Sequence, residues 1–222
     1  MKKYLIAVVM CLASFHVSAN KVNLDHQHNV EIQKKEFQQV MENDFYEYLT
    51  ELKAADLYIE PDHRSKAIFE RLKNQAIRQH PEAKKWKWEF LGDSQSYFNA
   101  FSGVNGKVVL GQDLFDQELF SDDELAFVIA HELVHSIKDH ARQEFSENYG
   151  AVEYIKLSQR LELEADYLAL DLVKRAGYNA KNGVVYLKKI GDYYSEMDIE
   201  QGESSSHPSI ALRYNLLNKL LK

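Results

Sequence analysis

The stretch LAFVIAHELVHSIKDH, residues 125–140, places two histidines and a glutamate in an otherwise apolar helical pattern. His131 and His135 are four residues apart, so on a helix both imidazoles project from one face, about one turn apart. This spacing suits two imidazoles that bind one zinc ion. Glu132 lies about 100° around the helix from His131, where its carboxylate can act on a zinc-bound water as a general base. The pattern therefore indicates hydrolysis by a metal-activated water.

The His-Glu-x-x-His motif alone is suggestive rather than decisive. With the nine histidines and 34 acids of this chain, it is expected by chance about once in twenty chains of this length. In the ordinary alternative, Glu132 and His135 are partly exposed helix residues and His131 is satisfied by a neighbour. A third protein ligand would favour the metal site, because a catalytic zinc has three protein ligands and leaves its fourth position to water.

The best candidate for the third ligand is Glu162, which follows in the run SQRLELEADYLALDL. Asp166 lies four residues further on, so the two carboxylates share a helix face. With Glu162 on the metal, Asp166 can accept the second ring N–H of a ligating histidine and fix its tautomer. The same pair equally fits a solvated helix. His140 lies about 180° around the helix from His131, and no glycine breaks that helix, so we expect His140 to cap the helix or lie on the surface.

A polar loop, GESSSHP, adds His207, and Arg213 follows six residues later. A histidine on a loop near zinc can occupy the open position in a resting state, or donate to the oxyanion as water attacks a carbonyl. Arg213 can hold a carboxylate of the site in a bidentate pair. Both residues equally fit ordinary surface positions.

Helical periodicity predicts the elements that must position these side chains. Pro61 ends the first helix and Pro81 the second, Ser121 caps the motif helix, and Gly177 closes the next one. The predicted helices cover residues 31–59, 62–80, 125–140, 152–176, 184–194 and 210–221.

A small sheet is expected between the second and third of these helices. Trp86, Trp88 and Phe90 alternate with charged residues, and Asn105-Gly106 separates residues 97–101 from residues 107–110 as in a hairpin. We therefore predict an α+β fold, mainly helical, with a small antiparallel sheet in one globular domain.

The first 19 residues, MKKYLIAVVMCLASFHVSA, are typical of a secretory signal peptide cut after Ala19. The apolar run is shorter than the roughly 20 residues of a spanning helix, and an uncleaved anchor is the weaker alternative. Cys11, the one cysteine, lies in this leader, so no disulfide is expected in the mature chain. Without Lys2 and Lys3 the net charge changes from −7 to −9, which argues against nucleic acid or an anionic membrane as the main partner.

In their order along the chain, these motifs resemble the M48 zinc metallopeptidases, and in particular an exported bacterial branch. The resemblance runs from about Trp86 to Leu221 and includes NAF at residues 99–101, DDELAFVIAHELVHSIKDH, ELEAD, AGY at residues 176–178 and HPSIALR. Together with the predicted signal peptide at 1–19, it divides the chain into a helical segment at 20–85 with no assigned role and a zincin-like peptidase core at 86–222. The cleavable leader and this branch of the family predict a periplasmic location.

The resemblance carries roles for individual residues. It implies one zinc on His131, His135 and Glu162, and Glu132 as the catalytic base. Asp166 matches an acid behind the ligands, and His207 and Arg213 match a histidine and an arginine linked to gating or transition-state stabilisation. Asn99, Ala100 and Phe101 match the strand edge along which a substrate peptide lies extended.

Two functions follow as hypotheses. The first is a zinc-dependent endopeptidase that acts on protein substrates in the cell envelope, with unfolded or misassembled proteins implied by the family. The second is a non-catalytic chaperone or adaptor of envelope proteins whose zinc site is plugged by His207.

Overall fold

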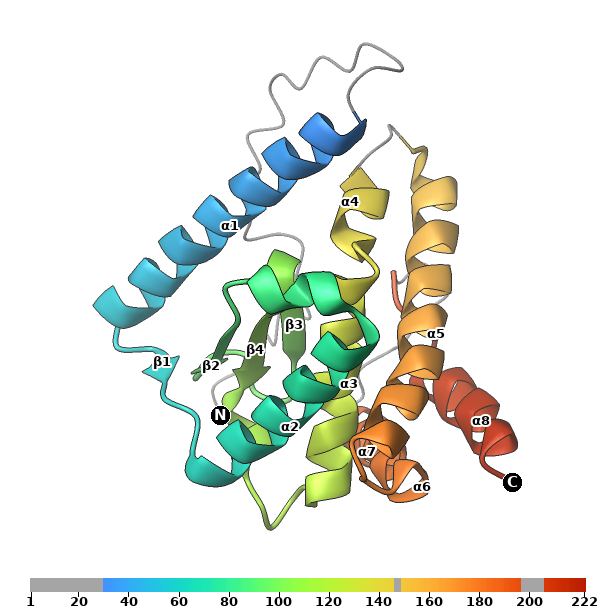
Figure 1. Cartoon of the computed structure of the whole chain (residues 1–222). Helices are drawn as coiled ribbons and strands as arrows, with labels where there is room; N and C mark the ends of the chain where they lie inside the picture. Colours follow the sequence, from blue (N-terminus) through green and yellow to red (C-terminus); the bar gives the residue numbers. More distant parts are fainter. Residues whose placement is uncertain (1–29, 146–148, 197–205) are drawn as a thin grey trace.

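The computed structural model describes residues 30–145, 149–196 and 206–222, which form helices around a small sheet (Figure 1). The predicted leader and most of the GESSSHP loop lie outside these residues. None of the helices in the described ranges has the length and hydropathy that a bilayer crossing requires. The helices are α1 (Val30–Ala54), α2 (His63–Gln79), α3 (Asp122–Ile137), α4 (His140–Phe145), α5 (Ala151–Arg175), α6 (Ala180–Gly183), α7 (Val185–Glu196) and α8 (Ile210–Leu220).

The sheet contains β1 (Tyr58–Ile59), β2 (Glu89–Asp93), β3 (Ala100–Gly103) and β4 (Lys107–Gly111), in the order β1-β2-β4-β3. The predicted hairpin is present, with β3 antiparallel to β4. The prediction of an antiparallel sheet is wrong, because β2 and β4 run parallel, with Phe90 opposite Val108. The chain passes from β2 to the far edge, forms β3 there and turns back between them as β4, which gives β4 the direction of β2. The mainly helical α+β class is confirmed.

Alternate residues of β4 pack into two different cores. Val108 and Leu110 belong to the large core that contains α2 and α3, whereas Val109 packs with Phe45 of α1 and Leu91 of β2. This is the two-residue alternation of a strand covered on both faces. Each fully buried aliphatic side chain stabilises the fold by about 1.5–3 kcal/mol relative to an exposed one.

The first predicted helix is too long at its end. Helix α1 stops at Ala54, Asp56 takes a left-handed conformation with φ of 58°, and the chain reverses into β1. Tyr58 and Ile59 then pair with β2. Tyr58 and Ile59 therefore form a strand although their apolar spacing also fitted a helix. Helix α2 has the predicted extent, with Asp62 as its N-cap.

The motif helix α3 begins with a capping box. The Ser121 backbone N–H donates to the Glu124 carboxylate at 2.8 Å, and the Glu124 N–H donates to the Ser121 hydroxyl at 3.4 Å. Such a cap satisfies helix N–H groups that lack a partner and contributes about 1 kcal/mol. Helix α5 ends as predicted before Gly177, whose φ is 81°. Helix α5 packs against α3, and its Ala165 and Ala169 are fully buried.

Candidate active site

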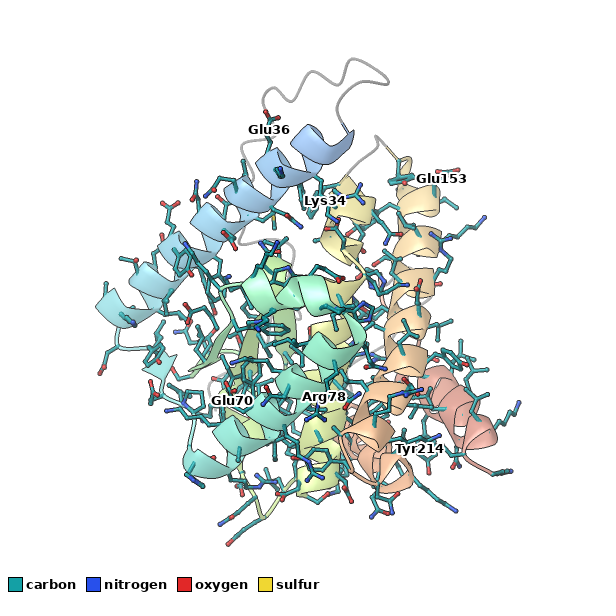
Figure 2. All side chains as sticks on the ribbon, viewed as in Figure 1. Lys34, Glu36, Glu70, Arg78, Glu153 and Tyr214 are labelled. Atoms are coloured by element: carbon teal, nitrogen blue, oxygen red, sulfur yellow. The ribbon has the colours of Figure 1, made fainter. Side chains whose placement is uncertain are left out.

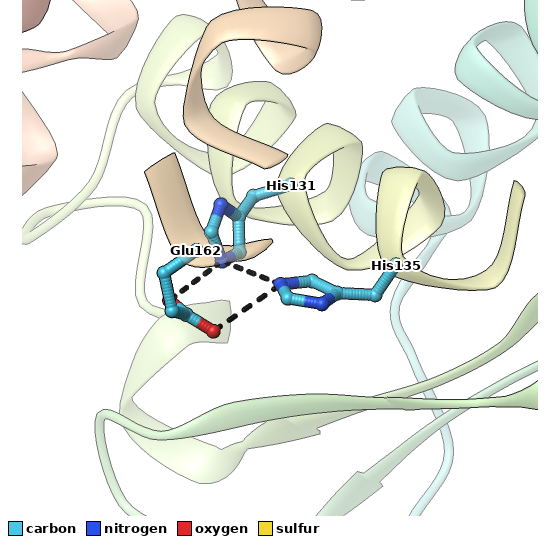
Figure 3. Close-up of side chains that lie close together, drawn as sticks. All are labelled: His131, His135 and Glu162. Atoms are coloured by element: carbon cyan, nitrogen blue, oxygen red, sulfur yellow. Dashed lines mark hydrogen bonds and ion pairs between the residues drawn. The ribbon is translucent and has the colours of Figure 1, made fainter. Parts of the chain in front are cut away.

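His131 and His135 of α3 converge with Glu162 of α5 (Figure 3). The Nε2 atoms of the two histidines are 3.1 Å apart, and each lies 3.4 Å from a different carboxylate oxygen of Glu162. All three side chains are less than one-fifth exposed. The four-residue spacing on α3 and the packing of α5 against it thus bring the three predicted ligands together.

The geometry and chemistry of this group fit a zinc ion. Ligand atoms about 2.0–2.1 Å from a tetrahedral zinc lie about 3.3 Å from one another, which is close to the separations of 3.1 and 3.4 Å here. Two imidazole nitrogens and one carboxylate are also the donor set of many catalytic zinc sites, which keep a further position open.

The electrostatics of the three residues favour a cation. Burial lowers the pKa of His135 to about 3, so this ring is neutral and has a lone pair to offer. Burial opposes ionisation of Glu162, but the neighbouring His207 and a hydrogen bond with His131 hold its pKa well below the usual range. Burial also lowers the pKa of His131, yet Asp166 and Glu162 outweigh this and raise it to about 10. Because a metal binds the neutral imidazole, a proton and a metal compete for Nε2 of His131.

Glu132 lies next to the ligand group and is buried, with 8% of its surface exposed. Burial is the main cause that raises the pKa of its carboxyl to about 7, while the charge of His131 lowers it. A hydrogen bond from the Ser102 side chain of β3 also lowers it. A pKa near neutrality suits a general base. Ser102 was missed by the sequence reasoning, because nothing in its strand marks which residue faces α3.

Asp166 and Arg213 form a buried pair behind the ligands. Arg213 of α8 donates from Nε and Nη2 to the two oxygens of Asp166, at 2.8 and 2.7 Å, and its Nη1 lies 3.5 Å from Glu162. Oδ1 of Asp166, the oxygen that accepts from Nη2 of Arg213, also lies 3.1 Å from Nδ1 of His131. Burial raises the pKa of Asp166, but Arg213 outweighs it and lowers that pKa to about 2. The two residues therefore have the contacts expected of a bidentate clamp that orients His131.

His140 does not have the surface position that we expected. Helix α3 ends at Ile137, and Asp139 takes a left-handed conformation with φ of 55°, so the chain turns before α4 begins at His140. The His140 ring is buried, with 1% exposed, and its Nδ1 lies 3.1 Å from Nδ1 of His135. The expectation failed because it assumed one continuous helix. Asp, like Asn, enters the left-handed region far more often than most residues, and Asp139 was the available signal.

His207 lies at the rim of the site. Its Nε2 is 3.5 Å from Glu162, its Nδ1 is 3.0 Å from the Ser206 hydroxyl, and 55% of its side chain is exposed. The chain from His207 to α8 thus brings both predicted C-terminal residues, His207 and Arg213, to the ligand group from a distant part of the sequence. The exposed ring and its distance of 3.5 Å from Glu162 suit a group that approaches the reacting atoms from solvent.

Residues 99–101 enter β3, the strand at the open edge of the sheet beside α3. The Asn99 carbonyl accepts from the Gly111 N–H at 2.7 Å, and Phe101 packs against Tyr48 of α1 at 5.6 Å between ring centroids. The Ser136 hydroxyl of α3 donates to the Gly103 carbonyl at 2.5 Å, which ties the edge strand to the motif helix. An extended peptide added at this edge would lie beside the ligand group.

A helix carrying His-Glu-x-x-His, a carboxylate from the next long helix and an edge strand alongside define a metallopeptidase type of site. Residues 61–155 match the family model of peptidase family M48. This range holds His131, Glu132 and His135, and it begins within the segment that the sequence analysis separated from the core. The comparison confirms the resemblance to the M48 family; the exported bacterial branch stays a prediction.

Two relatives carry the same name, "Mitochondrial metalloendopeptidase OMA1". The protein from Arabidopsis thaliana is 28% identical over 152 residues, which cover 59% of this chain and 31% of the relative. The protein from Saccharomyces cerevisiae is 23% identical over 164 residues, which cover 62% of this chain and 47% of the relative. The matched part of the chain therefore spans 31% and 47% of the length of these relatives.

Proposed function

We propose that this chain is a zinc-dependent endopeptidase that hydrolyses peptide bonds in unfolded or misassembled envelope proteins. The observation that carries the proposal is the convergence of two Nε2 atoms and one carboxylate within 3.4 Å, next to a buried glutamate. The match to the M48 family and the metalloendopeptidase relatives support the reaction class. The predicted leader supports the periplasm as the location and envelope proteins as the substrates.

His131, His135 and Glu162 would hold the zinc. When bound, zinc supplies a Lewis acid that lowers the pKa of water and polarises the scissile carbonyl. Glu132 takes the proton of the attacking water and delivers it to the leaving amine, a task that its pKa near 7 suits. Asp166, fixed by Arg213, keeps His131 oriented with Nε2 toward the ligand group.

The remaining residues handle the substrate. The edge of β3 pairs with the backbone of an extended peptide, so that the peptide needs to be locally unfolded. His207, which is half exposed and 3.5 Å from Glu162, donates to the oxygen of the carbonyl as negative charge develops there. An unfolded substrate is therefore favoured by the geometry of the strand edge as well as by the proposed location.

The contact between His207 and Glu162 also supports a second candidate, a zinc-bound adaptor that does not cleave. A histidine that closes the open metal position would prevent water from binding there. In this reading His207 is a plug, and the β3 edge binds unfolded proteins without hydrolysing them.

The two candidates differ in the effect of Glu132→Gln. The test compares the wild-type chain, Glu132→Gln and the control Glu70→Gln, each loaded with zinc, for cleavage of β-casein as an unfolded substrate. Glu70 is exposed on α2, so it controls for loss of one carboxylate. The proposal expects Glu132→Gln to keep its zinc and to lose cleavage at least about 1,000-fold, while Glu70→Gln cleaves like wild type. A zinc-loaded wild type that leaves casein intact would favour the adaptor.

A further inference from the structure

A cavity of about 100 Å³ opens directly beside His135, at the place where α1, the β3–β4 turn and the junction of α3 with α4 meet. Its wall is largely apolar. The apolar side chains come from three separate parts of the chain, and they are Met41, Phe45, Phe101, Val104, Ala141 and Phe145. The lining thus includes a predicted metal ligand, His135, and residues of α1, which belongs to the helical segment without an assigned role.

Three of the polar residues that line this cavity are already bonded to the protein. Ser136 donates to the Gly103 carbonyl at 2.5 Å, the Asn105 amide donates to Glu42 at 2.9 Å, and Asp139 pairs with Arg142 at 2.6 Å. A polar ligand would have to compete with these bonds, because a buried polar group without a partner is costly. The cavity therefore favours an apolar occupant.

The position of α1 is fixed rather than adjustable over its middle turns. The Lys107 ammonium, fully buried, lies 3.4 Å from Glu42, and the hydroxyl of Tyr48 donates to Asp93 of β2 at 2.9 Å. Phe45 is 1% exposed and fills the space between α1 and the sheet. The wall that α1 contributes is consequently preformed, and its shape can discriminate between occupants.

The first turns of α1 reach across to the end of α3 and to α4. Lys34 lies 4.0 Å from Asp139, and Figure 2 shows it between α1 and α4. Phe37 packs on Phe145 at 6.3 Å between ring centroids. These contacts hold the first turns of α1 against Asp139, between α3 and α4, and against Phe145 of α4.

We propose that this cavity is a specificity pocket for a medium-sized aliphatic side chain of the substrate, close to the scissile bond, and that α1 builds it. The inference rests on the proposed peptidase function. A peptide paired along the edge of β3 runs past Ser102, which bonds Glu132, and Gly103, which lines the cavity. Side chains alternate along an extended peptide, so one of them near the reacting carbonyl points toward the cavity.

The size of the cavity decides the class of side chain. Its volume of about 100 Å³ is smaller than the apolar cavity of ~150 Å³ that binds benzene in another protein. Leu, Met and Val are therefore the expected residues, and Trp is expected to be excluded. Apolar pockets discriminate between side chains that differ by one methylene about 10- to 200-fold in kcat/KM.

The test uses two substitutions with opposite effects on the pocket. Ala141→Leu adds volume inside it, and Met41→Ala removes volume from its α1 wall, while Val40→Ala changes a neighbouring α1 residue that is 45% exposed and outside the cavity. Cleavage sites in β-casein are mapped by mass spectrometry for all four zinc-loaded chains. Wild type and Val40→Ala should share a preference for Leu, Met or Val at one position near the cut.

The two substitutions should shift the residue preference of cleavage in opposite directions. Ala141→Leu should lower the preference for Leu over Ala at the selected position about tenfold. Met41→Ala should increase cleavage at sites with Phe or Trp at that position. A cleaving wild type whose site preference is the same in both variants would overturn the pocket and leave the peptidase intact. A zinc-loaded wild type that cuts nowhere would overturn the peptidase and the pocket with it.

Binding gives a second readout that does not depend on hydrolysis. In the Glu132→Gln background, fluorescence anisotropy of a labelled peptide taken from a mapped casein site measures the Kd for Leu and for Ala at the selected position. The Kd of the Ala peptide divided by the Kd of the Leu peptide should fall about tenfold on adding Ala141→Leu and stay unchanged on adding Val40→Ala. An unchanged ratio with Ala141→Leu contradicts the pocket.

Discussion

Nδ1 of His140 lies 3.1 Å from Nδ1 of His135, so the ring that faces the ligand group with Nε2 is held from behind by a second buried histidine. When Nε2 of His135 offers its lone pair to a metal, Nδ1 carries the proton and donates it to His140. The other nitrogen of His140 then points toward Glu164, at 3.9 Å. His140 is therefore a positioning residue for a predicted ligand.

We expect His140→Phe to weaken zinc binding by about 10- to 100-fold, because the ring volume is kept and the hydrogen bond to His135 is lost. The dissociation constant is measured by competition with a chelator. His140→Asn, which can still accept from His135, should recover part of the affinity. Equal affinity for wild type and both variants would show that His140 only fills space.

Glu162→Ala tests the third ligand. We expect its zinc affinity to fall by more than about 100-fold, since two imidazoles complete too little of the tetrahedron. Elemental analysis of the purified chain gives the zinc content directly. Glu153→Ala, an exposed residue at the start of the same helix, is the matched control and should bind about one zinc per chain. Stoichiometric zinc in Glu162→Ala would remove Glu162 from the ligand set.

Much of the site could be predicted from the sequence because side chains four residues apart lie on the same face of a helix. Four-residue spacing placed His131 with His135 and Glu162 with Asp166, and the structure has each pair on one helix face. The cap at Ser121 was equally local, since a capping box needs only residues three apart. Local rules of this kind hold wherever the chain stays in one element.

The predictions that were wrong concern points where the chain leaves a helix or strand. His140 is brought back toward His135 because Asp139 takes a left-handed conformation, and α1 ends where Asp56 takes the same conformation. The parallel pairing of β2 with β4 depends on the path between the strands, which alternation of apolar residues does not encode. The hydrogen bond of Ser102 to Glu132 follows from that same packing and has no signature in the sequence.

Arg213→Ala should destabilise the metal-free chain by about 3 kcal/mol, because it leaves the buried carboxylate of Asp166 without its bidentate partner. Urea unfolding in the presence of a chelator measures the change in the free energy of unfolding. Arg213→Lys should cost less, since it keeps the charge and loses one of the two parallel bonds. A loss below about 0.5 kcal/mol in Arg213→Ala would mean that the pair contributes little.

The lowered pKa of Asp166 also predicts that the metal-free chain loses stability at low pH. Its pKa is lowered from the ordinary 3.8 to about 2 in the folded state, so its contribution to stability is complete above about pH 4 and is lost as the pH falls toward 2. The loss is on the order of 2 kcal/mol. Unfolding free energies between pH 5 and pH 2 should show a drop in wild type that is smaller in Asp166→Asn. The same drop in both chains would assign the acid sensitivity to other carboxylates.

His207→Ala decides between the two roles of the rim histidine. If His207 donates to the developing oxyanion, its removal lowers kcat about 100-fold, because such donors act mainly in the transition state. The zinc content stays the same, since His207 is 55% exposed and its contact is with Glu162 at 3.5 Å. The opposite result, faster cleavage by His207→Ala, would identify His207 as a plug. Cleavage rates of the zinc-loaded chains on β-casein separate these outcomes, and Ser209→Ala, which removes the cap of α8 and no predicted site group, controls for disturbance of the loop.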